Sequence, residues 1–136
     1  MKAKLAGDSA SAISHGLDDT ASYYPGYYGT EQLLASGADV DCIYFQNDSM
    51  AFGGLQYCQK IGLKIPNEVG IAGWGDMPIA SVLQQRLTSL HVSHLKLGQA
   101  AAEAMVARIS DEPYPAARDI GFHLVPGTTT QPLAPK

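Results

Sequence analysis

A strand-helix-strand unit between residues 42 and 76 is the feature that most constrains the fold of this chain. Cys42–Phe45 is an unbroken apolar run, as expected for a parallel strand covered on both faces, and it stops at Gln46-Asn47-Asp48. Apolar residues then recur at helical spacing, and a second apolar run, Val69–Ala72, ends at Gly73-Trp74-Gly75-Asp76. The unit predicts an α/β fold with a three-layer, doubly wound parallel sheet.

Polar side chains stand at both strand ends of this unit. Asp48 is placed to cap the helix that follows the first strand, and Asn47 lies beside it. Asp76 comes at the end of the second strand. Because the carboxyl ends of parallel strands share one edge of a sheet, where α/β folds bind ligands, we expect a small-molecule pocket at this edge.

Composition narrows the class of protein. The 136 residues suffice for one domain, and 46% hydrophobic residues argue against disorder. A net charge of −4 leaves no basic face, so we expect no DNA binding by this segment itself. No apolar run approaches the roughly 18 residues of a membrane span, and the first residues lack the apolar core of a signal peptide. Cys42 falls in a predicted buried strand and Cys58 on a predicted helix face, so we interpret both as reduced core thiols, which indicates a cytoplasmic protein.

The rest of the chain alternates helix and strand. The predicted elements are a helical opening to about His15, a helix at Gly29–Ser36, a short helix at Ile79–Gln84, a strand at Leu87–Val92, a helix capped by Ser93, and a strand at Ile120–Val125. The helix after Ser93 carries one apolar stripe, made by Leu95, Ala102, Met105, Val106 and Ile109. The Thr-rich tail from Thr128 is expected to fray.

A cluster of four tyrosines in six residues, Tyr23–Tyr28, falls on a predicted loop. Tyrosine suits any half-buried surface that also contacts water, so these rings either cover the edge of the protein's own core or stack against a sugar-like ligand. Both interpretations stay open at the level of sequence.

Several phrases resemble the effector-binding region of the lactose-repressor/galactose-repressor (LacI/GalR) family of bacterial transcription regulators. The phrases are Gln46–Gly53, Gly62–Trp74, Leu87–Leu90, Leu97-Gly98, Val125–Thr130 and, near the start, Leu5-Ala6-Gly7. They match a family pattern of a strand ending in Asn-Asp, a Met-Ala-hydrophobic-Gly helix start, a Gly-Leu-x-x-Pro turn and a strand ending in Gly-aromatic-Asp-Asp. The resemblance covers nearly the whole chain.

This resemblance implies two α/β subdomains of the type I periplasmic-binding-protein kind, with the effector in the cleft between them. By position, residues 1–92 are the second subdomain, residues 93–112 the returning helix that packs on the first subdomain, and residues 113–136 the final strand and tail. The DNA-binding headpiece and most of the first subdomain are expected to be absent. The apolar stripe of the returning helix must then be covered by this chain or by another copy. The resemblance also implies a homodimer.

Effector contacts are carried over only where the motif matches. In family members the Asn of the Asn-Asp pair reaches ligand hydroxyls, which implies this role for Asn47. Many members have Asp directly after the Gly-aromatic pair, whereas this chain has Gly75 first, so Asp76 lies one residue out of register. A pocket that loses a carboxylate favours an anionic effector. Gluconate-type repressors also lack an acidic residue there, and Tyr57–Lys60 resembles their sequence, so a sugar acid is the leading effector class.

Three further residues complete the predicted ligand site. Trp74, just beyond its strand, is interpreted as a wall that stacks on the apolar face of a sugar, with a core residue as the alternative. Tyr23 belongs to the tyrosine cluster. Lys2 lies near a position where the family often has a basic ligand-binding residue, and it either supplies a counter-charge or is a solvated lysine.

Catalytic and metal-binding patterns are weak. His91 and His94 straddle a strand end and a helix cap instead of sharing one helix face with each other, which argues against a metal site with Asp76. There is no nucleophile elbow, dinucleotide fingerprint or phosphate-binding loop. We therefore expect neither an enzyme nor a cofactor. The leading hypothesis is the effector-sensing domain of a LacI-type regulator. The alternatives are a transport receptor or stand-alone sugar-binding module, and a remnant without ligand function.

Overall fold

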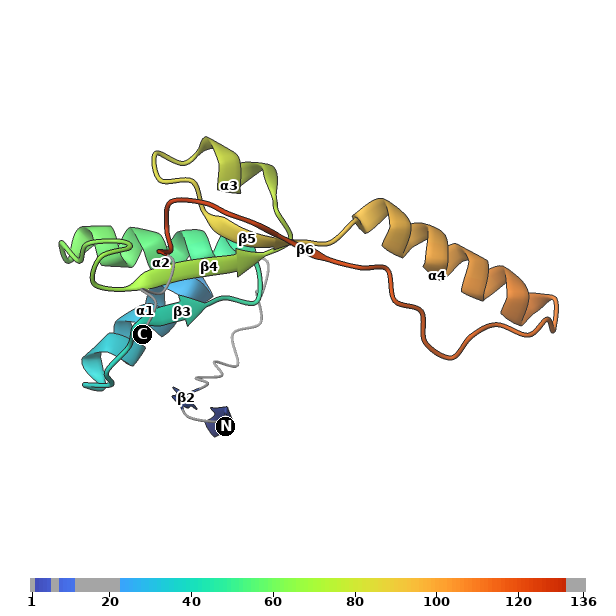
Figure 1. Cartoon of the computed structure of the whole chain (residues 1–136), viewed down its shortest axis with the longest axis horizontal. Helices are drawn as coiled ribbons and strands as arrows, with labels where there is room; N and C mark the ends of the chain where they lie inside the picture. The colour runs from blue at the N-terminus through green and yellow to red at the C-terminus, as the bar shows by residue number, and fades with distance from the viewer. Residues whose placement is uncertain (1, 6–7, 12–22, 132–136) are drawn as a thin grey trace.

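The computed structural model of the chain describes residues 2–5, 8–11 and 23–131 (Figure 1). Its elements, in chain order, are β1 (Lys2–Leu5), β2 (Asp8–Ser11), α1 (Tyr24–Ala35), β3 (Cys42–Tyr44), α2 (Asp48–Lys60), β4 (Gly70–Trp74), α3 (Pro78–Val82), β5 (Thr88–His91), α4 (His94–Ile109) and β6 (His123–Val125). None of the helices in these residues is both long and apolar enough to cross a membrane.

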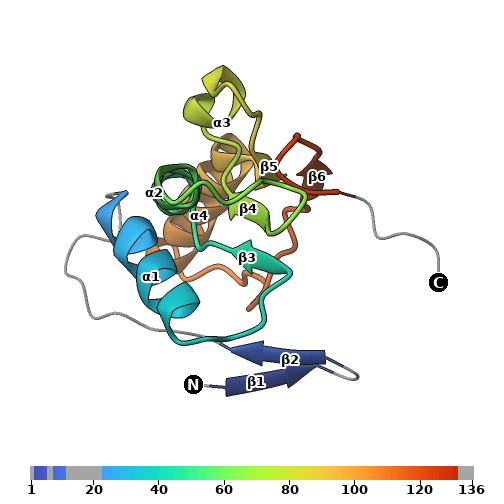
Figure 2. The same ribbon diagram turned by 90° about the vertical axis from the view of Figure 1, so that its left-hand side faces the viewer.

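A four-stranded sheet with the order β3-β4-β5-β6 organises the fold. The strands β3, β4 and β5 run parallel, and β6 pairs antiparallel with β5, so the predicted parallel α/β sheet is confirmed with one antiparallel edge strand. In Figure 2, α1 and α2 lie on one side of this sheet. Buried apolar side chains fill the space between α2, α3 and the sheet, and they are Phe45, Ala51, Leu55, Cys58, Ile65, Val69, Ile71, Ala80 and Leu87.

The opposite face of the sheet is open in the described part of the chain. On β3, Cys42 is exposed and Tyr44 is 57% exposed, so the expectation that this strand is covered on both faces is wrong there. The reason is that α2 and α3, which connect the three parallel strands, pack on one face only, while α4 lies away from the sheet. Both cysteines are free thiols, but only Cys58 is buried as predicted; the expectation that Cys42 is a core thiol is wrong, because it lies on this open face.

Two glycines let α1 and α2 pack backbone to backbone. A Cβ atom on Gly26 would lie 1.8 Å from the carbonyl oxygen of Met50, and one on Gly53 would lie 1.9 Å from that of Tyr23. Only glycine fits such an approach. The predicted loop at Tyr23–Tyr28 is therefore wrong, because these residues form the start of α1, with Pro25 in the first turn, where its missing N–H costs nothing.

The described start of the tail, Thr128–Gln131, is not frayed as expected, because it is hydrogen-bonded to the sheet and to the loops beside it. The rest of the predicted tail lies outside the described residues. Thr129 is fully buried, and its hydroxyl donates to Ile71 O at 2.7 Å and accepts from Thr88 N at 2.9 Å. The backbone continues the pattern, since Ile71 N donates to Thr129 O at 2.8 Å. The threonine hydroxyls thus do what a further strand would do for these backbone groups.

The described part of the chain's opening forms strands where a helix was expected. Lys2–Leu5 and Asp8–Ser11 pair antiparallel, with Lys2 opposite Ser11 and Leu5 opposite Asp8. Both runs consist mainly of polar and small residues without a helical apolar stripe, and mutual pairing satisfies their backbone groups. The remainder of the predicted opening helix lies outside the described residues.

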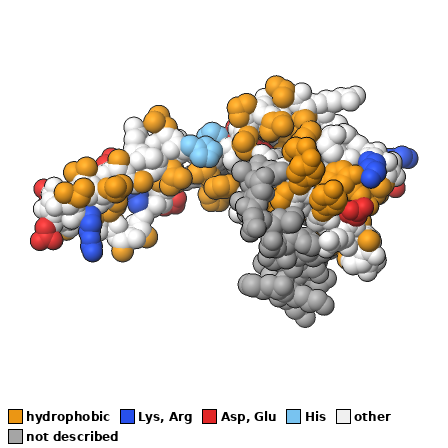
Figure 3. Space-filling view, turned by 180° about the vertical axis from the view of Figure 1, so that it is seen from behind, with side chains coloured by type: hydrophobic (Ala, Val, Ile, Leu, Met, Phe, Trp, Pro, Cys, Tyr) orange, Lys and Arg blue, Asp and Glu red, His pale blue; other side chains and the backbone are white. Residues whose placement is uncertain are grey.

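The helix α4 and the segment after it, residues 94–122, form an arm that projects from the body of the molecule, residues 23–93 and 123–131 (Figure 1). As predicted, Ser93 caps α4, its hydroxyl accepting from Lys96 N at 3.3 Å. One face of α4 contacts its own return segment, where Tyr114 Oη donates to Ala100 O at 3.0 Å and Arg118 pairs with Glu103. The apolar stripe stays bare, with Ile109 81% exposed, and Figure 3 shows hydrophobic side chains along the arm.

Candidate functional site

The helix α2 begins at the carboxyl end of β3, and its cap differs from the prediction. Asn47, not Asp48, is the N-cap residue, and its Oδ1 accepts from Met50 N at 2.8 Å. The prediction that Asp48 caps the helix is therefore wrong. Asn47 has the extended backbone of an N-cap residue, so the helix begins at Asp48. The side chain of Asp48 therefore points into the protein and does not cap the helix.

Asp48 is fully buried and joins α2 to the two neighbouring strands. Its Oδ1 accepts from Ser89 Oγ of β5 at 2.7 Å, and its Oδ2 accepts from Met77 N, just after β4, at 2.6 Å. Gly73 of β4 leaves room for this carboxylate, because a Cβ atom there would lie 2.3 Å from Asp48 Oδ1. A buried carboxylate with two donors is satisfied and holds three elements together at one edge.

The turn after β4 is strained and is held by β5. Gly75 has a φ of +117° and Asp76 a φ of +49°, which is the left-handed region that ordinary residues avoid. Gly75 N donates to Leu90 O at 2.8 Å, and Asp76 N donates to Ser89 Oγ at 3.0 Å. These bonds offset the strain and place Asp76 at the carboxyl edge of the sheet.

The side chain of Asp76 meets a histidine that the sequence did not single out as a ligand residue. His91 Nδ1 lies 3.0 Å from Asp76 Oδ2, and both side chains are about one-third exposed, at 35% and 30%. Across the β5–β6 pair, the ring of His123 lies against that of His91, with centroids 4.7 Å apart and the planes tilted by 32°. A signal was present in the sequence, since His91 stands at the end of the β5 run and Asp76 shortly after the β4 run, but the sequence did not fix the pairing of the two strands.

Trp74 lies at the same edge but on the other side of the sheet. Gly73 faces Asp48, so by strand alternation Trp74 extends from the opposite face, where it is 37% exposed. It lies directly across from Leu90, which in turn lies across from Leu124. Near this row, partial burial and then the Asp48 charge raise the pKa of the Tyr44 phenol. The Trp74 ring and the Asp76–His91 pair therefore border the edge from two sides.

The remaining predicted ligand residues are less closely joined to this edge. Tyr23 stands at the start of α1, 44% exposed, and its ring packs edge-on against Phe52 of α2 at 6.2 Å. Tyr27 packs likewise on Tyr57, which supports the interpretation that the tyrosines cover the α1–α2 edge. Lys2 lies in β1, and its side chain is outside the described part of the structure. Ligand contact by Tyr23, Lys2, Asn47, Trp74 and Asp76 stays a prediction.

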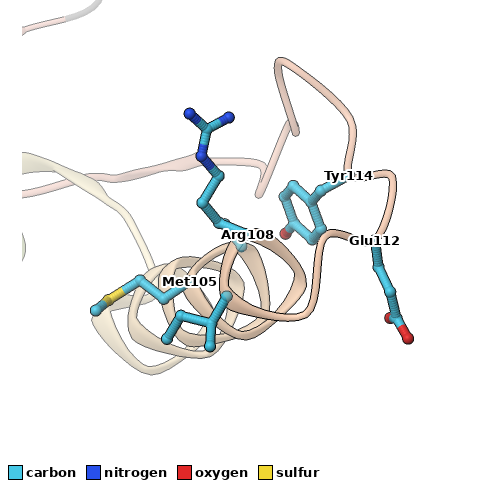
Figure 4. A pocket seen from close by; sticks show the side chains of 6 residues that line it. Met105, Arg108, Glu112 and Tyr114 are labelled. Atoms are coloured by element: carbon cyan, nitrogen blue, oxygen red, sulfur yellow. The ribbon is translucent and has the colours of Figure 1, made fainter.

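A hollow of about 500 Å³ lies away from this edge, on the arm (Figure 4). Met105, Arg108 and Glu112 surround it together with Tyr114 from the return segment. It adjoins the bare apolar stripe and contains none of the predicted ligand residues. Among residues 2–5, 8–11 and 23–131, no three His, Cys, Asp or Glu side chains are grouped so as to hold a metal ion.

Comparison with known proteins identifies the family. Residues 8–130 match the family described as periplasmic binding protein-like domain. The chain belongs to this family. Within it, the relatives are LacI-type regulators, and the chain corresponds to the effector-binding region of LacI/GalR proteins, as the sequence phrases indicated.

Two relatives and one solved structure illustrate the similarity. The HTH-type transcriptional regulator GntR of Escherichia coli K12 is 33% identical over 112 residues, which cover 82% of this chain and 34% of the relative. The lactose operon repressor of Rhizobium radiobacter is 30% identical over 65% of this chain and 79% of the relative. The crystal structure of the transcription regulator GntR from Chromobacterium violaceum has a TM-score of 0.68 and 30% identity, covering 80% of this chain and 41% of that one. The periplasmic binding protein-like chain thus spans about a third of the E. coli relative.

Proposed function

We propose that the chain is the effector-sensing part of a LacI-type transcriptional regulator. It binds a small sugar or sugar acid at the carboxyl edge of the β3-β4-β5 sheet. Ligand binding controls DNA binding by a headpiece that is not part of this sequence. The protein works as a homodimer, without cofactor or catalysis.

The observation that carries this proposal is the convergence of polar groups at one sheet edge. The Asn47 amide, the Asp76 carboxylate and the His91 imidazole all stand at or just beyond strand ends there, while Trp74 supplies an apolar wall on the other side. Amide and carboxylate oxygens accept from sugar hydroxyls, and an aromatic face covers the apolar side of a sugar ring. The family of the chain and the regulator names of its relatives support the regulatory role.

Titration calorimetry on the whole chain tests the proposal. A panel of hexoses, pentoses and aldonic acids is expected to contain at least one ligand that binds, and Asp76→Asn and Trp74→Ala are expected to weaken that binding by about tenfold or more. Asp119→Asn serves as the control, because Asp119 lies on the arm, where it accepts from Gly121 N of the same segment. No binding by any member of the panel, or equal binding by Asp76→Asn and the wild type, would count against the proposal.

Binding affinities from the same panel show whether the effector is a sugar or a sugar acid. The Asp76 carboxylate favours a ligand that donates hydroxyls, whereas His91 and His123 favour one that carries negative charge. A preference of tenfold or more for aldonic acids over the matching sugars is the outcome that supports an acid effector.

A further inference from the structure

The arm is joined to the body through a neck in which two histidines face each other. His91 is the last residue of β5, shortly before the arm begins at residue 94, and the chain returns to the body at His123, the first residue of β6. These residues are direct partners in the β5–β6 register, and their rings are 4.7 Å apart. Figure 3 shows histidine side chains gathered where the arm meets the body. A change in the orientation of the arm relative to the body therefore has to alter the backbone at or next to this pair of strand ends.

The same strand end holds the turn that carries Asp76. Three consecutive residues of β5 bind it: the Ser89 hydroxyl accepts from Asp76 N, the Leu90 carbonyl accepts from Gly75 N, and His91 Nδ1 bonds with Asp76 Oδ2. The first two contacts fix the backbone of the turn. His91 is the residue that fixes the direction of the Asp76 side chain.

The Asp76 carboxylate keeps one oxygen for a ligand. His91 engages Oδ2, and within the described part of the chain no group donates to Oδ1. The side chain is 30% exposed, so a ligand at the edge can reach it. Without His91, the carboxylate would be free to rotate, and a bound hydroxyl would have to restrict it at an entropic cost.

We propose that His91 is a positioning residue, which holds the Asp76 carboxylate for a ligand hydroxyl and ties that carboxylate to the neck of the arm. This inference rests on the proposed function, because it takes Asp76 as a ligand contact. It adds that occupation of the edge and orientation of the arm are coupled through one hydrogen bond and one ring contact. A ligand that displaces the Asp76 side chain also displaces His91, because the two are hydrogen-bonded. Displacement of His91 in turn disturbs its ring contact with His123.

Binding measurements test the positioning role. His91→Ala removes both contacts and is expected to weaken the best ligand of a D-glucose and D-gluconate comparison about tenfold or more. In His91→Asn the amide nitrogen takes the place of Nδ1 as donor to Asp76, so affinity within about threefold of the wild type is expected. His94→Asn is the matched control, since His94 is an exposed histidine at the start of α4. Wild-type affinity in His91→Ala would overturn the positioning role.

Spin-label distances test the neck separately from any ligand. One label is placed on the exposed native Cys42 and the other on Ala101→Cys in α4, while the buried Cys58 stays unlabelled. His91→Ala is expected to broaden the body-to-arm distance distribution, and so is His91→Asn, because it keeps the bond to Asp76 but loses the ring contact with His123. His94→Asn should match the wild type.

The two experiments separate failure of the inference from failure of the proposed function. If the wild type binds neither D-glucose nor D-gluconate, the distances still decide whether His91 fixes the neck. A distribution in His91→Ala and His91→Asn as narrow as in the wild type would overturn the coupling, whatever the binding data show. A broadened distribution together with weaker binding in His91→Ala and near-normal binding in His91→Asn is the result that supports it.

Discussion

Replacing Asp48 with alanine removes the buried carboxylate that joins α2 to the ends of β4 and β5. The change leaves Met77 N and the Ser89 hydroxyl without their acceptor. Asp48→Asn is the milder variant for comparison, because its amide oxygen still accepts from Met77 N while its NH₂ group faces Ser89 Oγ. Ser89 Oγ then accepts from both Asp76 N and the amide, and only the hydroxyl proton loses its partner.

The magnitudes follow from burial. Asp48 is 0% exposed, so water does not replace the lost bonds. A hydrogen bond to a charged group contributes about 1.5–3 kcal/mol, so the two lost bonds give about 3–6 kcal/mol for Asp48→Ala and the one lost bond about 1.5–3 kcal/mol for Asp48→Asn. Because domains of this size are stable by only about 5–15 kcal/mol, the alanine variant is expected to lie close to the unfolding threshold at 37 °C.

Urea unfolding followed by tryptophan fluorescence measures these losses, since Trp74 is the single tryptophan and lies two residues from Asp76. A double-mutant cycle with Ser89→Ala isolates the bond between the two side chains and is expected to show a coupling of about 1–2 kcal/mol. Equal stability of Asp48→Ala and Asp48→Asn, or a loss below about 1 kcal/mol in either, would refute the assignment of Asp48 as the junction of the site edge.

Four further outcomes are expected. Gly53→Ala should lose about 1–3 kcal/mol of stability because its Cβ would lie 1.9 Å from a carbonyl oxygen. Gly98→Ala, whose Cβ would meet no atom of the described residues within 4 Å, should gain up to about 1 kcal/mol from helix propensity, and urea midpoints compare the two variants. Thr129→Val should cost about 2–4 kcal/mol, with Thr129→Ser near wild type, because two buried backbone groups lose their partner; equal midpoints for the two variants would contradict this. Burial raises the pKa of Cys58 from 9.0 to about 11, so the free energy of unfolding should fall by about 2–3 kcal/mol as the pH rises from about 9 to 11. Unfolding curves of Cys58→Ala measured in parallel should lack this decline. Met105→Gln, at a position 65% exposed on the arm, should reduce self-association in sedimentation runs while leaving the free energy of unfolding in urea within about 0.5 kcal/mol of the wild type. Unchanged association would show that the apolar stripe does not mediate self-association.

The sequence was most informative where local and tertiary signals agreed. The apolar run from Cys42 and the one from Val69 predict parallel strands, and both strands form, joined by α2 as expected. Ser93 predicts the start of α4 because cap chemistry depends only on nearby backbone. Local capping and apolar periodicity therefore sufficed for the central unit.

Tertiary contacts account for most of the misses. The tyrosine segment is helical because Gly26 and Gly53 allow α1 to lie directly on α2, a contact that no local pattern reveals. Asn47 and Asp48 are both good caps by propensity, and only the position of Ser89 in the neighbouring strand decides which of them turns inward. His91 likewise gains its meaning from the register of β5 with its neighbours, which pairs residues that are 15 and 32 positions away in sequence.

Closure of the sheet by Thr129 has a consequence for the order in which the protein assembles. The hydroxyl of Thr129 reaches Ile71, 58 residues earlier, and the whole arm lies between them in the chain. During synthesis from the amino terminus, Ile71 and Thr88 are made long before the residue that satisfies their backbone groups. The body therefore cannot complete its sheet until residue 129 is made, and a release of the nascent polypeptide before Thr129 would leave the start of β4 and β5 open to pairing with other strands.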